Sequence, residues 1–318
     1  MKFINSSPQI KQYNSSVTVN LSFESMESFL QDAENKVIAI IGEETADAIA
    51  ASTDFVATLV KAAVVNFALA DYSDSGALLI SDSGMHVVKG DSKLPASDKK
   101  IVAFKRSCVE KAWKALEGAI YQMELHVEDW PIWYLSADRK RYLSNLLNFS
   151  NDIEEHTRML VTPSLFQRLR SEINRCEEDS IQPLLGEAVF DSLRLRYIEH
   201  ALSDLDRQLI KRIVKAVAPL SIAYSIPYLA VEIDANGVYQ LSQVALSSQS
   251  DNIEQKSSPQ ARTLQNTMNR LITTGEAELE SLRKWMNKNK SGFPGYTDNV
   301  IAPMASINDD PSSGVYFM

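Results

Sequence analysis

The chain has 318 residues, of which 45% are hydrophobic and 23% are charged, and its formal net charge is −9. These proportions are typical of a folded globular protein, and the length fits one large domain or two of ordinary size. The negative net charge argues against a surface whose main function is to bind nucleic acid or anionic lipid.

The first half of the chain predicts one mainly helical unit. Residues 1–14 are polar and are expected to form a loose arm. Apolar residues at helical spacing predict a helix over 25–41, which Gly42 ends before a short helix begins at Glu43. The next predicted segments are an apolar core helix over 54–71, a β-hairpin over 77–88 and a long helix that begins at Ser97. The apolar stripe of that long helix is Ile101, Phe104, Cys108, Ala112, Leu116, Ile120 and Met123.

The second half repeats this plan after an aromatic connector at 130–135 and a basic helix over 136–147. Pro163 has the place of a first-turn proline, and Pro219 is expected to kink or end the third helix that follows. The tail after about Asn289 is expected to be flexible. The predicted elements are helices over 163–185, 187–201 and 204–223, a hairpin over 228–241 and a long helix from Pro259.

The two halves also correspond residue by residue. Ile40-Ile41-Gly42-Glu43 matches Leu184-Leu185-Gly186-Glu187, and in both the Gly is expected to end one helix where the Glu begins the next. The offset grows from 143, between Ile10 and Ile153, to 163, between Leu116 and Leu279. The order never breaks, which predicts a tandem duplication of one unit of about 120 to 135 residues. The alternative is convergent helix patterning.

We therefore predict a mainly α (α+β) fold in which each copy of the unit has a β-hairpin and a long C-terminal helix. The predicted segments are a first unit with an N-terminal arm at 1–127, a linker at 128–150, a second unit at 151–290 and a flexible tail with an aromatic tip at 291–318.

The residue patterns in the sequence predict no catalytic, cofactor-binding or metal site. Ser97-Asp98-Lys99-Lys100 fits Ser-x-x-Lys, but a helix cap explains it better. Asp234-Ala235-Asn236-Gly237 resembles the start of a calcium loop but lacks the downstream acidic ligand, which favours a hairpin turn. Histidines 86, 126, 156 and 200 are scattered without ligand spacing. Cys108 and Cys176 are expected to be buried free thiols in a reducing compartment.

Three clusters are candidates for contact with partners. The aromatic residues at 130–134 form either core filling between the units or an exposed binding patch. Arg139, Lys140 and Arg141 form either a solvated helix face or a nucleic-acid contact. The C-terminal tip is an apolar segment on a polar tether, which is predicted to dock onto a partner. The docking residues are Val315, Tyr316, Phe317 and Met318. No apolar run approaches about 18 residues, which predicts no membrane span.

The duplicated plan, the Leu185-Gly186-Glu187 step, the Pro-started long helices and the aromatic tip resemble a connector-like family. Its members are encoded near capsid genes in phages and prophages of Bacteroidota, including crAss-like phages. Each unit is similar to the helical head–tail connector, or adaptor, of tailed phages, although simple connectors have one such unit.

The resemblance implies a virion structural protein in the neck between capsid and tail, assembled in the bacterial cytoplasm. It implies a ring of about twelve subunits that docks on the portal protein and on neighbouring tail or ring proteins. DNA would pass through the ring without specific binding. The alternative is a non-catalytic cytoplasmic protein-binding module that uses the aromatic connector as its interface, and an enzyme with an unrecognised site would need buried titratable groups in a cleft.

Overall fold

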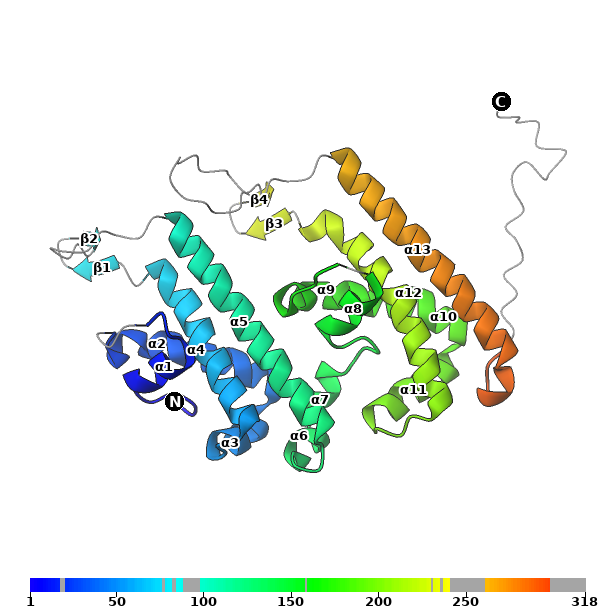
Figure 1. The fold of residues 1–318 in the computed structure, drawn as a ribbon, viewed down its shortest axis with the longest axis horizontal. Helices are drawn as coiled ribbons and strands as arrows, with labels where there is room; N and C mark the ends of the chain where they lie inside the picture. The colour runs from blue at the N-terminus through cyan, green and yellow to red at the C-terminus, as the bar shows by residue number, and fades with distance from the viewer. Residues whose placement is uncertain are drawn as a thin grey trace.

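The computed structural model describes residues 1–17, 21–75, 78–81, 84–87, 98–157, 159–229, 231–234, 237–240 and 261–297. The fold is mainly helical, and its helices gather into two groups that lie side by side along the longest axis (Figure 1). The buried apolar residues form two clusters, of which one ends at Leu143 and the other begins at Leu146. Each group of helices therefore has its own core.

In the first unit, α4 packs between α2 and α5, and short helices close the ends of this layer. Strands β1 and β2 pair antiparallel, with Leu78 opposite Val87. The elements are α1 (Ser7–Tyr13), α2 (Phe23–Ile41), α3 (Glu43–Ala51), α4 (Phe55–Ser75), β1 (Leu78–Ser81), β2 (Gly84–Val87), α5 (Asp98–Leu125), α6 (Pro131–Leu135) and α7 (Ala137–Tyr142).

The second unit has the same order, with α12 packed between α9 and α13. Strands β3 and β4 pair antiparallel, with Val231 opposite Gln240. The elements are α8 (Ser150–Thr157), α9 (Pro163–Cys176), the π-helix η1 (Glu177–Ile181), α10 (Gln182–Leu185), α11 (Glu187–Ile198), α12 (Asp204–Leu229), β3 (Val231–Asp234), β4 (Gly237–Gln240), α13 (Ala261–Lys288) and the 3-10 turn η2 (Lys290–Gly292). The turn residues Ala235 and Asn236 lie outside the described residues.

The glycine corners have the same geometry in both units. Gly42 has φ 82° and ψ 155°, and Gly186 has φ 81° and ψ 143°. Each glycine N–H donates to the carbonyl four residues back, and each glycine carbonyl accepts from the amide four residues on. A side chain is strained in this region of backbone space, so only Gly fits well. The predicted helix-to-helix corner is confirmed at both places.

A single inserted residue explains how the offset between the units begins to change. The buried positions of α2 and α9 correspond with an offset of 143 up to Glu34 and Glu177, and with an offset of 144 at the glycine corners. Between these points lies η1, and a π-helical turn accommodates one extra residue in an α-helix. The buried pairs are Met26 with Leu169, Leu30 with Ile173, Ala33 with Cys176, Val37 with Ile181 and Ile41 with Leu185.

The expectation of a loose N-terminal arm is wrong. Phe3 and Ile4 are buried in the first core, and the backbone N–H groups of both donate to the carboxylate of Glu34. In the second unit the N–H groups of Leu146 and Leu147 donate to Glu177 in the same way. A buried backbone needs hydrogen-bond partners, and a buried Glu supplies them here. The polar composition of residues 1–14 gives no local sign of this tertiary contact with Glu34.

The boundaries at 128–150 and 291–318 also need correction. Trp130 and Trp133 belong to the first core, whereas Leu146 and Leu147 belong to the second, so the linker is divided between the two units. In the tail, Phe293 and Tyr296 are buried in the second core. The aromatic connector therefore fills the core, and the second unit extends past residue 290.

Helix α12 continues through Pro219, which corrects the prediction that this residue could end it. Proline in a helix interior costs roughly 3 kcal/mol because it removes one backbone hydrogen bond. The residues around Pro219 are almost fully buried against α9 and α13, and this packing outweighs the local cost.

Helix α4 is the apolar core helix that the sequence predicts over 54–71. By length and composition alone, residues Phe55–Ser73 could cross a membrane, so the statement that no run approaches that length was wrong. Most of this stretch is buried between α2 and α5. The core helix of a globular protein passes the same test, so the stretch is weak evidence for a membrane span.

Candidate functional site: the junction between the two units

One face of α5 carries the contact between the units. Glu110, Glu117 and Glu124 recur every seven residues, which places them on one side of the helix two turns apart. Glu110 accepts from the hydroxyls of Thr162 and Ser164, at 3.2 and 2.7 Å. All three carboxylates therefore have partners across the junction or next to it.

Glu117 is buried against the start of α8. Its Oε1 accepts from the Oγ of Ser150 at 2.6 Å and from the N–H of the same residue at 3.1 Å. Burial raises the pKa of the Glu117 carboxyl, and the hydrogen bonds from Ser150 oppose that rise. Beside this contact the rings of Tyr121 and Phe149 meet edge to face, with their centroids 5.4 Å apart. This polar and aromatic pair fixes α8 against α5.

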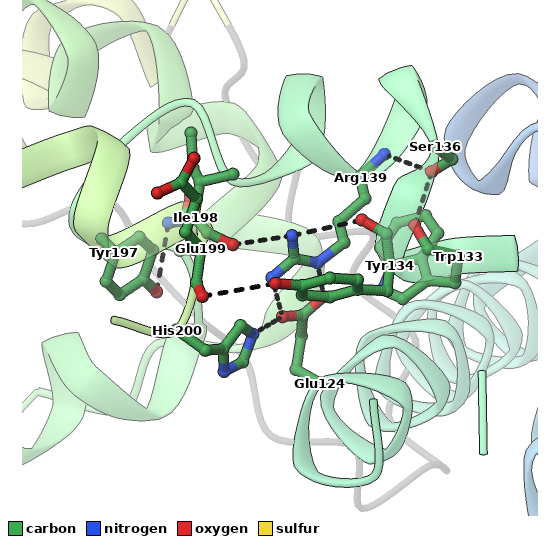
Figure 2. Close-up of polar contacts among 10 residues, drawn as sticks. Glu124, Trp133, Tyr134, Ser136, Arg139, Tyr197, Ile198, Glu199 and His200 are labelled. Carbon is green, nitrogen blue, oxygen red and sulfur yellow. Dashed lines mark hydrogen bonds and ion pairs between the residues drawn. The ribbon is translucent and has the colours of Figure 1, made fainter. Parts of the chain in front are cut away.

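Glu124 forms the centre of a second network at the other end of the face (Figure 2). Arg139 donates to both oxygens of Glu124, at 2.8 and 2.9 Å, and its third donor group reaches the carbonyl of Ile198 at 2.8 Å. The indole Nε1 of Trp133 donates to the same carboxylate at 2.6 Å, and His200 Nε2 lies 3.0 Å from it. The network therefore joins α5, α7 and the end of α11.

Arg139 is thus a structural residue and not part of a basic surface patch. Its side chain is 1% exposed, whereas Lys140 and Arg141 are exposed. Its guanidinium also lies 4.7 Å from the ring centre of Tyr134. An Arg fork suits this role because it can bind a carboxylate with two bonds and a carbonyl with a third. Neither reading of the Arg139–Arg141 cluster, as a solvated face or as a nucleic-acid contact, holds for Arg139.

Further titratable groups lie buried near the junction. Burial raises the pKa of Glu177 to about 8 and that of Asp152 to about 6. Both oxygens of Glu177 are engaged by the backbone N–H of Leu146 at 2.8 and 3.1 Å. These contacts give Glu177 a structural role, in which it satisfies the backbone that enters the second core.

The structure places the other predicted residues as follows. Cys108 and Cys176 are buried and free, as predicted. The docking residues Val315, Tyr316, Phe317 and Met318 lie outside the described residues. Across the described ranges, no group of three or more His, Cys, Asp or Glu side chains could hold a metal ion. The seven-residue spacing of the three glutamates of α5 is the sequence signal from which their shared face could have been predicted.

The molecule is a mainly helical protein built from two similar units packed side by side. It belongs to a family of unknown function, DUF6712, whose sequence model matches residues 21–142 and 181–302. The two matches are consistent with a tandem duplication, and they assign α6 and α7 to the first unit. No curated protein and no solved structure matched the chain.

Proposed function

We propose that this protein is a virion structural protein, a head–tail connector ring that docks on a phage portal and extends the DNA channel. The observation that carries the proposal is the side-by-side packing of two similar units, each matched by the same family. Side-by-side packing joins two different faces of similar units. Such heterologous contacts build a ring when the rotation from each subunit to the next closes on itself. The resemblance of the sequence plan to phage connectors supplies the virion context.

In this proposal each unit is a connector-like copy with its hairpin and long C-terminal helix as repeated parts. One unit docks on the portal and the other on the next ring, and the acidic chain lets DNA pass without adhering. The role is non-catalytic. The junction supports this, since Glu117, Arg139 and Glu177 hold helices and backbone together.

The rival proposal, a cytoplasmic protein-binding module, used the aromatic connector as its interface. Trp130 is 8% exposed and Trp133 is fully buried, so these indole rings cannot serve as that interface. A binding module would need another surface, which makes the connector ring the better-supported proposal.

The test is to purify the protein, measure its mass by light scattering alone and with the portal protein, and analyse purified particles by mass spectrometry. We expect a complex with the portal and a stoichiometric band in particles. A strict monomer that never joins the portal or the particle would contradict the proposal. A stable complex with a host protein, together with absence from particles, would favour the binding module.

A further inference from the structure

We infer that the contact between the two units is used a second time, between copies of this chain. The outer face of α13 in one copy packs against the α1 and α2 side of the next copy, as α5 packs against α9 and the first residue of α8 within the chain. The inference deepens the proposed ring and rests on it for ring closure. The contact itself follows from the correspondence of the two units.

Helices α5 and α13 are equivalent parts of the two units, and both span 28 residues. With an offset of 163, Ala119 corresponds to Leu282 and Met123 to Met286, and all four are buried. The hydrogen bonds repeat as well. Trp133 donates to Glu124, and at the same offset Tyr296 donates to Asn287 at 2.6 Å. The faces of the two helices can therefore be compared position by position.

At the same offset of 163, Glu280 on α13 corresponds to Glu117 on α5. Within the chain Glu117 is 8% exposed because the second unit covers it. The side chain of Glu280 is 41% exposed and pairs with Arg283 and Lys284 on its own helix. The described part of the chain thus carries the same carboxylate twice, once covered and once open.

The receiving side repeats with an offset of 143. Phe3 and Ile4 correspond to Leu146 and Leu147, which are buried in the equivalent way. At the same offset Ser7, the first residue of α1, corresponds to Ser150, the first residue of α8. Ser150 is the residue that donates to Glu117, and Ser7 is only half-buried. Figure 1 shows α1 and α2 at one end of the molecule and α13 at the other.

Both partners of the internal contact thus have counterparts at opposite ends of the molecule that the chain itself leaves partly exposed. A contact between Glu280 of one copy and Ser7 of the next continues the arrangement already present in the chain. The match is less apolar than the internal one, because Tyr121 and Phe149 are replaced by Lys284 and Ser6. We therefore expect contact between copies to be weaker and more sensitive to salt than contact within the chain.

The test is chemical crosslinking of the full chain with a short bifunctional maleimide. The test variant carries Ser7→Cys with Glu280→Cys, and its matched control carries Ser7→Cys with Ser281→Cys. Position 281 is exposed and lies about 100° around the axis of α13 from position 280. The native Cys108 and Cys176 are 1% and 2% exposed, so they contribute little background. Each substitution alone provides one thiol, which can give dimers but no longer species.

We expect a ladder of dimers, trimers and longer species with the test variant, and no ladder with the control. Equal ladders in the two would overturn the inference. The same crosslink is then sought in purified particles. A ladder in solution with no protein in particles would keep the contact and remove the connector role. Protein in particles without the crosslink would keep the connector role and overturn the contact.

Discussion

At the residue scale, buried titratable side chains hold backbone and helices together in this chain. Glu34 and Glu177 occupy equivalent places and each accept N–H groups from the segment that enters their unit. Arg139 satisfies one carboxylate and one carbonyl from the neighbouring unit. A buried ion pair adds little net stability, but the loss of one partner leaves the other charge buried and uncompensated.

Arg139→Ala is therefore expected to lower the free energy of unfolding by about 3–5 kcal/mol, because it leaves the carboxylate of Glu124 buried without its guanidinium partner. The matched control is Lys140→Ala, next to it and exposed, which should change stability by less than about 0.5 kcal/mol. Urea denaturation followed by circular dichroism measures both. A loss no greater than that of the control would show that Arg139 is not structural.

Glu177 predicts a pH dependence of stability. The folded chain holds this proton up to a pKa of about 8, whereas the unfolded chain releases it near its usual 4.5. Between these two pH values the folded state therefore binds more protons than the unfolded state. The stability that Glu177 contributes is complete below pH 4.5 and is lost as pH rises through 8. Glu177→Gln keeps an acceptor for the backbone and removes the titration. Thermal unfolding from pH 5 to 8 should show a flatter midpoint curve for this variant, and an unchanged curve would refute the assignment.

At the element scale, glycines have opposite roles that depend on their neighbours. Gly42 and Gly186 adopt a backbone region that strains other residues, and a Cβ at Gly42 would also collide with Asp138. Gly275 lies where α13 crosses α12, and a Cβ there would meet Leu220 at 2.4 Å. Gly118 in α5 has only ordinary contact, at 3.6 Å from Leu59.

Gly186→Ala should destabilise the protein by about 1–3 kcal/mol through backbone strain alone, since its Cβ would meet nothing within 4 Å. Gly42→Ala should cost more, because the collision with Asp138 adds to the same strain. Chemical denaturation of the two variants measures the difference. Equal losses would mean that the side chain of Asp138 turns away from the new Cβ without cost.

The two helical glycines give a prediction of opposite sign. Gly118→Ala should raise stability by roughly 0.5–1 kcal/mol, because Ala is the better helix former and the space is open. Gly275→Ala should lower stability by about 1–3 kcal/mol, because it forces α12 and α13 apart. Thermal melts of both variants are the measurement, and a stabilised Gly275→Ala would refute the close crossing.

At the scale of the whole molecule, two units with separate cores share a polar junction, and their equivalent outer faces remain open. This arrangement suits repetition from copy to copy more than it suits an isolated monomer. The tail beyond the second core supplies a further candidate contact, with its apolar tip at Tyr316 and Phe317.

Substitution of both Tyr316 and Phe317 by Ala should leave the thermal midpoint unchanged and abolish incorporation into particles, because the tip is predicted to dock on a neighbour. The control replaces the polar tail residues Asp309 and Asp310 by Ala. Incorporation is measured by mass spectrometry of purified particles. Normal incorporation of the Tyr316 and Phe317 variant would remove the tip from the docking surface.

The sequence alone determined most of the long helices, the glycine corners, the stripe of α5 and the duplicated order. These features depend on local periodicity and on backbone preferences, which a short window of residues reveals. Only the tertiary structure showed that residues 1–14 are anchored, that α12 passes Pro219 and that Arg139 is buried. Each of these depends on partners distant in sequence, such as Glu34 for Phe3 and Ile198 for Arg139, and local pattern carries no information about which distant groups will meet.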